Sequence, residues 1–126
     1  MATMELTAQN LNETIENNDI LLIDFWSDWC PPCKIFGPVF EKASEKHDDM
    51  TFAQCNTEKQ QEVAGAFGIR SIPTLAVFKE QVLVFLQPGA LPAEALDEIL
   101  GKVRELDMDE VRKEIAEQEE KEGSAS

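Results

Sequence analysis

Residues 21–34 read Leu-Leu-Ile-Asp-Phe-Trp-Ser-Asp-Trp-Cys-Pro-Pro-Cys-Lys. The apolar run at 20–26 has the composition of a strand that is buried on both faces, and a helical pattern follows it. Cys30 then lies at the N-terminus of a helix, where the helix dipole favours the thiolate form of a cysteine. Cys33 lies one helical turn further on, within disulfide reach of Cys30. This arrangement predicts thiol–disulfide exchange.

The chain contains three cysteines, Cys30, Cys33 and Cys55. An odd number without a recognisable leader does not indicate a structural disulfide framework. A zinc site is the alternative use of the first two, but zinc takes four ligands, commonly as two closely spaced pairs. Only Cys55 and His47 remain, without paired spacing, and we expect the first to be inert and buried and the second to lie at the surface. We therefore expect no metal and no cofactor beyond the redox-active disulfide.

The composition indicates one soluble domain with a strong negative charge. The 126 residues include 25 acidic and 11 basic side chains, which give a net charge of −14. That charge disfavours nucleic acid and anionic membranes as partners, because phosphate binding requires clustered positive charge. It suits a partner protein with a basic docking surface, and it equally suits simple solubility. Because the chain lacks both a run of about 20 apolar residues and a signal-like N-terminus, we expect a cytoplasmic protein unless a leader has been removed. We also expect a monomer.

Hydrophobic periodicity and turn residues predict alternating helices and strands. Helices are expected over about 8–17, with Thr7 as N-cap, over about 31–47 and 58–66, and from Pro92 onward. Strands are expected at about 20–26, 50–55, 74–79 and 82–87. This order predicts an α/β fold with a mixed central sheet flanked by helices.

Residues 107–126 are expected to form a C-terminal helical extension with a polar tail, outside a domain formed by residues 1–106. The helical spacing of the apolar residues is interrupted near Asp107. The spacing of a capping box there predicts a new helix over about 108–119. One face of this helix carries Met108, Val111 and Ile115. That face either packs on the domain or docks a partner.

Several motifs beyond the cysteine pair make the chain resemble the thioredoxin family. In chain order they are Asp24-Phe25-Trp26, Trp29-Cys30-Pro31-Pro32-Cys33-Lys34, Pro38, Gly68-Ile69-Arg70-Ser71-Ile72-Pro73-Thr74 and Gly89-Ala90-Leu91. Their order and spacing match the family over about residues 4–104. The resemblance implies the thioredoxin fold and a protein-disulfide reductase active in electron transport and cell redox homeostasis. It also implies re-reduction by a flavin-containing thioredoxin reductase that draws on NADPH.

Three side chains are expected to carry the reaction. Cys30 is the nucleophile that attacks a substrate disulfide, and Cys33 resolves the mixed disulfide. Asp24 lies inside an apolar run, where burial raises the pKa of a carboxyl group. It can accept the proton of Cys33 and return it later, as the matching aspartate of thioredoxins is thought to do. The structural alternative is an aspartate at a strand end whose oxygens are satisfied by backbone donors.

The resemblance also implies a cis peptide bond between Ile72 and Pro73, which bars metals from the thiols and presents the main chain of Ile72 to an extended substrate. An ordinary turn proline before a strand is the alternative. We expect a small apolar docking patch around an exposed Cys30 sulfur, formed by Trp29, Pro31, Pro32, Ile72, Pro73, Pro88, Gly89 and Ala90.

Three positions depart from the family pattern. Pro31 stands where the family has glycine. It removes a backbone donor and stiffens the loop, so the sign of its effect on the reduction potential is open. Gln54 stands where thioredoxins usually have lysine, so the pKa of Asp24 should be higher still and mixed disulfides should be resolved more slowly at acidic pH. The turn Glu80-Gln81 lacks the usual glycine, which leaves the turn type open.

Two other functions are compatible with the sequence. A disulfide oxidase or isomerase tuned by Pro31 is one, although such proteins normally carry a leader. A thioredoxin-fold binding module or scaffold is the other. A scaffold has no need of the intact set of two cysteines, aspartate and proline, so we favour the reductase.

Overall fold

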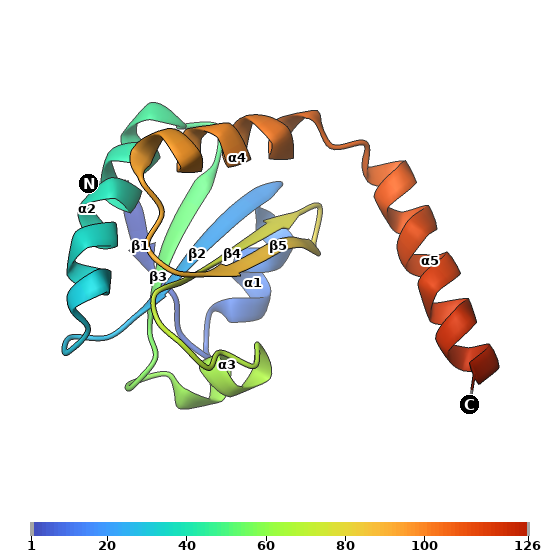
Figure 1. The fold of residues 1–126 in the computed structure, drawn as a ribbon, viewed down its shortest axis with the longest axis horizontal. Coiled ribbons are helices and arrows are strands. Elements are labelled where there is room, and N and C mark those ends of the chain that lie inside the picture. Colours follow the sequence, from blue (N-terminus) through green and yellow to red (C-terminus); the bar gives the residue numbers. More distant parts are fainter. Residues whose placement is uncertain (1, 126) are drawn as a thin grey trace.

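The computed structural model describes residues 2–125, with the side chains of residues 2–122 (Figure 1). The strands are β1 (Thr3–Glu5), β2 (Ile20–Trp26), β3 (Thr51–Asn56), β4 (Thr74–Lys79) and β5 (Val82–Pro88). The helices are α1 (Leu11–Asn17), α2 (Pro31–Lys46), α3 (Gln61–Ala66), α4 (Ala93–Glu105) and α5 (Met108–Ala125). The expected α/β order is confirmed, and β1 is an additional strand, too short to show a periodicity in the sequence.

The five strands form one mixed sheet in the order β1-β3-β2-β4-β5. The strands β1, β3 and β2 run parallel, whereas β4 is antiparallel to both β2 and β5. The central strand β2 is buried on both faces, which explains why its sequence is apolar except for Asp24. Parallel strands present their carboxyl ends at the same end of a sheet, and the loop that carries Cys30 begins there (Figure 1).

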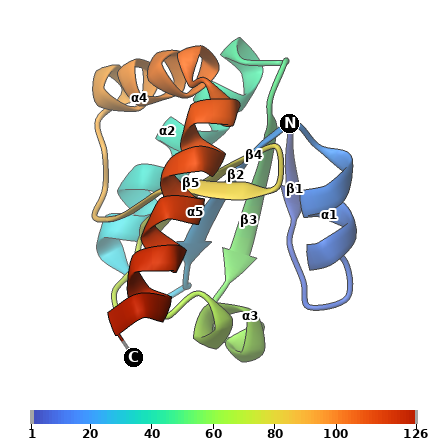
Figure 2. The ribbon, with the colours of Figure 1, turned by 90° about the vertical axis from the view of Figure 1, so that its right-hand side faces the viewer.

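Each face of the sheet has its own hydrophobic core. On one face, α2 and α4 pack against the strands through a cluster that includes Phe36, Phe40 and Leu100. On the other face, α1 and α3 pack through a cluster that includes Phe25 and Val63. Figure 2 shows α1 across the sheet from α2 and α4. Helices on both faces of a sheet give the three-layer arrangement that the sequence predicted.

The first helix begins later than the expected range of 8–17. The Thr7 N–H donates to Asn10 Oδ1 over 2.8 Å, and the Asn10 N–H donates to Thr7 Oγ1 over 3.3 Å. This reciprocal pair holds residues 7–10 in a turn, so α1 starts at Leu11 and Thr7 is not its N-cap.

A side-chain hydrogen bond also delays α3, which was expected over 58–66. The Asn56 Oδ1 accepts the backbone N–H groups of Glu58 and Lys59, at 3.0 and 3.3 Å. These bonds hold the residues after β3 in a turn, and the helix starts at Gln61.

The turn between β4 and β5 has positive φ at both central residues, 49° at Glu80 and 69° at Gln81. This is the φ pattern of a type I′ hairpin turn, which the right-handed twist of the two strands favours even without glycine. A backbone hydrogen bond holds the turn against the residue before β2, since the Glu80 N–H donates to the carbonyl of Asp19 over 2.7 Å.

A buried lysine closes the C-terminal end of α4. The Lys79 Nζ donates to the carbonyl oxygens of Val103, Arg104 and Leu106 at 2.9–3.0 Å. A helix leaves its last carbonyls without intrahelical partners, and a cation there also interacts favourably with the helix dipole. Lys79 thus ends α4 and fixes the point from which α5 departs.

The helix α5 stands away from the sheet beside the hairpin (Figure 1) and runs to the end of the described residues, further than expected. Met108 is buried, Val111 is half-buried, and Ile115 is 39% exposed. An ion pair of 2.8 Å joins Arg112 to Glu80 at the hairpin turn. Of the two alternatives for this face, packing on the domain therefore applies to Met108, whereas Ile115 lies further along the helix and is exposed.

We expect Lys79→Met to destabilise the protein by about 2–3 kcal/mol, because it leaves three carbonyl groups without their charged donor. Chemical denaturation of the oxidised protein measures the loss. Lys102→Met is the matched control, since Lys102 is 75% exposed and only pairs with Glu98 on the same helix. Equal losses for the two variants would contradict a stabilising role for the Lys79 contacts.

Candidate active site

The redox pair lies where β2 leads into α2. Cys30 precedes the helix, and Pro31 and Pro32 occupy its first two positions, where a missing N–H costs no helical hydrogen bond. Cys30 and Cys33 form a disulfide, with their Cα atoms 5.2 Å apart. The Cys33 N–H donates to Cys30 Sγ over 3.2 Å. Pro31 thus leaves a backbone donor at this sulfur, and the helix N-terminus can stabilise a thiolate there.

Cys30 is more enclosed than the sequence predicted, whereas a shielded Cys33 agrees with its expected place inside the first turn of the helix. Only 2% of Cys30 and 5% of Cys33 is exposed, whereas an exposed Cys30 was expected. The surface around the pair is occupied instead by larger side chains such as Trp29, which is 65% exposed. Cys30 lines a surface groove, which we call the docking groove.

The docking groove is formed by three loops that follow one another around the carboxyl ends of the strands. Its lining residues are Trp29, Cys30, Pro31, Pro32, Thr57, Ile69, Arg70, Ser71 and Ile72. The peptide bond between Ile72 and Pro73 is cis, as expected. The carbonyl oxygen of Ile72 lies 3.6 Å from Cys30 Sγ. A chain lying in the groove can therefore meet the sulfur and this main-chain acceptor together.

The segment around Gly89 joins the site through the backbone. The Gly89 N–H donates to the carbonyl oxygen of Pro73 over 2.8 Å. Its φ of 104° lies in the region that glycine adopts without strain, which explains the residue type at this position. Pro88 and Ala90 are exposed on either side of it and lie outside the groove lining.

Four residues of the groove lining were not expected there: Thr57, Ile69, Arg70 and Ser71. Three of them belong to the motif Gly68–Thr74, in which the sequence predicted substrate contacts for Ile72 and Pro73 but not for these residues. Thr57 follows β3, whose carboxyl end lies beside that of β2. The parallel pairing of these strands is the signal that could have placed Thr57 at the groove.

Asp24 is buried in the middle of β2, with 1% of its surface exposed. It lies between Gln54 on β3 and Leu75 on β4 in the strand register. Among the described residues, neither of its carboxylate oxygens has a hydrogen-bond partner. Burial raises the pKa of Asp24 to about 7, while the nearby Gln54 side chain opposes the rise. The alternative of an aspartate satisfied by backbone donors is thus excluded.

A second cavity, which we call the aspartate cavity, brings Asp24 and Cys33 together. It is also lined by Trp26, Ser27, Asp28, Lys34, Gly37, Pro38, Glu41 and Gln54. It shares no lining residue with the docking groove. The disulfide therefore separates two environments, with Cys30 in the groove and Cys33 against the buried carboxyl group. Exposed side chains at its rim, Lys34 and Glu41, leave the cavity open to solvent.

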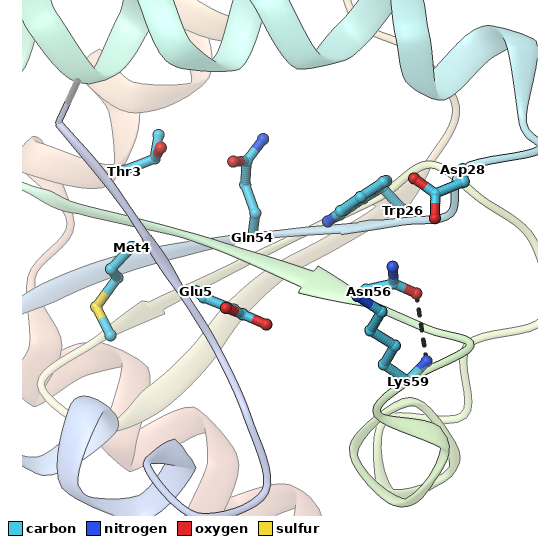
Figure 3. A pocket seen from close by; sticks show the side chains of 8 residues that line it. All are labelled: Thr3, Met4, Glu5, Trp26, Asp28, Gln54, Asn56 and Lys59. Carbon is cyan, nitrogen blue, oxygen red and sulfur yellow. Dashed lines mark hydrogen bonds between the residues drawn. The ribbon is translucent and has the colours of Figure 1, made fainter.

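A third cavity lies on the β1 side of the aspartate cavity, and its lining residues are drawn in Figure 3. The two cavities share Trp26, Asp28 and Gln54. Figure 3 shows Gln54 and Trp26 rising from the sheet on the side nearest α2. Because Gln54 borders both spaces, a longer side chain at this position has room beside Asp24.

Cys55 is buried as the sequence predicted, whereas His47 is less exposed than predicted. Cys55 is fully buried, and burial raises the pKa of its thiol to about 11, so it stays protonated and inert. His47 is not a surface residue, since its side chain is only 13% exposed. Its Nε2 lies 3.0 Å from Asp97 Oδ1 and its Nδ1 lies 2.5 Å from Arg104 Nη2, which ties the end of α2 to α4.

The described residues contain neither a metal-binding cluster nor a membrane-spanning helix. No group of three or more histidine, cysteine or acidic side chains in that part of the chain is placed to hold a metal ion. Within residues 2–125, none of the helices combines the length and the apolar character that a bilayer-spanning segment requires.

We expect the stability difference between Asp24→Asn and the wild type to depend on pH. Between about pH 4 and pH 7 the unfolded chain releases the Asp24 proton while the folded chain keeps it, so the wild type loses stability as the pH rises. The variant has no such group, and its advantage should grow by roughly 4 kcal/mol across this window and then stay constant. Urea unfolding between pH 4 and 8.5 measures this.

Asp48→Asn, which removes an exposed carboxylate, is the control for the loss of one charge and should change stability little. A difference between Asp24→Asn and the wild type that is the same at every pH would contradict the raised pKa.

Comparison with known proteins identifies the family. The thioredoxin family model matches residues 2–102. "Putative thioredoxin 2" of Streptomyces coelicolor is 57% identical over 118 residues, which cover 94% of this chain and 88% of that protein. The thioredoxin of Alicyclobacillus acidocaldarius is 41% identical over 103 residues, covering 81% of this chain and 98% of its own.

A solved structure agrees with these relatives. A mutant thioredoxin from Halobacterium salinarum superposes with a TM-score of 0.78 at 30% identity, over 83% of this chain and 93% of that one. The chain thus belongs to the thioredoxin family, and its disulfide makes it a thiol–disulfide oxidoreductase.

Proposed function

We propose that the chain is a reductase of protein disulfides, in which Cys30 attacks the substrate, Cys33 resolves the intermediate and Asp24 moves the proton. One observation carries this proposal. The disulfide lies between a groove that holds Cys30 and a separate cavity that holds Cys33 with an unpartnered, buried carboxyl group. The two halves of a dithiol exchange thus have different surroundings, each suited to its own step.

In the first step the Cys30 thiolate attacks one sulfur of a substrate disulfide that lies in the docking groove. The substrate S–S bond breaks, a mixed disulfide forms, and the other substrate sulfur leaves as a thiolate that takes a proton from solvent. The donor from the Cys33 N–H and the helix N-terminus stabilise the attacking thiolate. The main chain of Ile72 aligns an extended substrate without demanding a particular sequence.

In the second step Cys33 attacks Cys30 Sγ. Its thiol proton passes to ionised Asp24 through the aspartate cavity, the mixed disulfide breaks, and the second substrate sulfur leaves as a thiolate. A carboxyl group with a pKa near 7 can accept this proton and return it at neutral pH. The substrate ends with two thiols and two more electrons, and the protein ends with the Cys30–Cys33 disulfide present in this structure.

A further turnover requires two electrons and two protons from a reductant. By its family membership we propose an NADPH-dependent thioredoxin reductase for this step, which would connect the protein to cellular electron transport and redox homeostasis. No bound cofactor beyond the disulfide is needed for the exchange itself.

We propose a cytoplasmic monomer whose partners are proteins, because a net charge of −14 opposes nucleic acid and anionic membranes.

We also propose a division into a thioredoxin domain at 1–106 and an extension at 107–126. The family match ends at residue 102, before the turn into α5. The alignment with the Streptomyces relative covers 118 residues of this chain, which is more than the 106 residues of the proposed domain. That alignment therefore includes part of the extension.

The reduction potential of the Cys30/Cys33 couple tests the reductase against the alternatives. We expect about −270 mV against a defined thiol buffer, the value of a disulfide-reducing thioredoxin. A potential of about −180 to −120 mV would support the oxidase or isomerase, with Pro31 as the tuning residue. Failure to form the disulfide would overturn both redox functions and favour the binding module.

We expect Gln54→Lys to move the pH dependence of the second step to lower pH. The step needs ionised Asp24, so its rate rises with pH through the pKa of that group, and a nearby ammonium lowers this pKa. Single-turnover decay of the mixed disulfide between pH 5 and 9 measures the profile. Gln54→Met, a neutral side chain of similar length, should not move the profile downward. An unshifted profile for Gln54→Lys would show that Asp24 does not control the step.

A further inference from the structure

The docking groove contains one charged side chain. Of its nine lining residues, Arg70 alone has a charged side chain at neutral pH, and the others are apolar or uncharged apart from Cys30 itself. Three acidic residues, Asp24, Asp28 and Glu41, line the aspartate cavity, and none of them lines the docking groove. A substrate that approaches Cys30 therefore meets a cation in a chain whose net charge is −14.

The guanidinium of Arg70 is available to a partner. The chain has two other arginines, and each is paired, Arg104 with both carboxylate oxygens of Asp49 and Arg112 with Glu80. Among the described residues, no acidic side chain forms an ion pair with Arg70, which is exposed. A guanidinium presents a planar fork of donors that matches a carboxylate in two parallel hydrogen bonds.

The position of Arg70 relative to Cys30 Sγ determines where along a substrate an acidic side chain could contact the guanidinium. Arg70 lies two residues before Ile72 in the chain, and the carbonyl oxygen of Ile72 lies 3.6 Å from Cys30 Sγ. In an extended substrate, side chains on one side recur about every 6.5 Å, which is two residues. A side chain two positions from the attacked cysteine is thus within reach of a long arginine in the same groove.

The overall negative charge does not cancel this local preference. At physiological ionic strength the Debye length is about 8 Å, so distant surface carboxylates are screened while a direct contact in the groove is not. A basic side chain at the same substrate position would instead face Arg70 with like charge. The difference between the two substrates therefore depends on this one side chain.

We propose that Arg70 is a specificity-determining residue, which favours protein disulfides that carry an aspartate or glutamate two residues from the attacked cysteine. This inference rests on the proposed reductase function. The chemistry of the exchange is unchanged by it, and the selection acts on the first step, in which the mixed disulfide with Cys30 forms.

Three disulfide peptides test the proposal, identical except for glutamate, glutamine or lysine placed two positions before and after the attacked cysteine. The second-order rate constant for oxidation of the reduced, full-length protein is measured for each at physiological ionic strength. We expect the glutamate peptide to react about five-fold faster than the lysine peptide. Arg70→Gln should bring the ratio close to one, and Arg70→Glu should reverse it.

Lys113→Gln is the matched control, because it removes one positive charge from α5 and should preserve the ratio of the wild type. A glutamate-to-lysine ratio that stays the same in Arg70→Glu would overturn the proposal, even though all peptides are reduced. Failure of the wild type to reduce the glutamine peptide would instead overturn the reductase function on which the proposal rests. The two failures are therefore distinguishable.

Discussion

A carboxyl group without a partner in the interior of a sheet raises the free energy of the folded chain, and the active site is built around that penalty. Asp24 lies on the central strand, and its pKa near 7 corresponds to a cost of roughly 4 kcal/mol when it is ionised. Small domains are stable by only about 5–15 kcal/mol, so this cost is large. The two hydrophobic cores that enclose the strand offset it.

The same strand also determines where the cysteines lie. β2 ends at Trp26, and the short loop that follows carries Cys30 to the start of α2. The helix then turns Cys33 back over the face of the sheet that holds Asp24, so that both line one cavity. Cys30 remains outside that cavity, against the loop with the cis proline. The surroundings proposed for the two sulfurs, a buried base for Cys33 and a substrate groove for Cys30, thus both depend on one strand–helix junction.

Much of this site could be predicted from the sequence, because its chemistry depends on residues close together in the chain. The cysteine pair, the proline pair at the helix start and an acid in an apolar strand are all local patterns, and the structure assembles them as expected. The bounds of β4 were also predicted, since Thr74–Lys79 contains the apolar run Leu75–Phe78 and lies between turn residues.

The remaining features depend on contacts between distant segments. The enclosure of Cys30 results from loops that meet only in the folded chain, so its 2% exposure has no sequence signal. Arg70 and Thr57 enter the groove for the same reason. The late start of α1 follows from a reciprocal pair of side-chain hydrogen bonds that competes with helix formation. The contact of Lys79 with the end of α4 is likewise long-range, between a strand and a helix terminus.

The structure makes Asp24 a buried acid that is expected to change its charge near neutral pH. The direct measurement is a titration of the Asp24 side-chain carboxyl carbon by NMR in the oxidised, full-length protein, with Asp24→Asn used to assign the signal. The structure predicts a midpoint near pH 7. A midpoint near pH 4, the value of an ordinary exposed aspartate, would contradict the account, because Asp24 would then be unable to hold the proton of Cys33 at neutral pH.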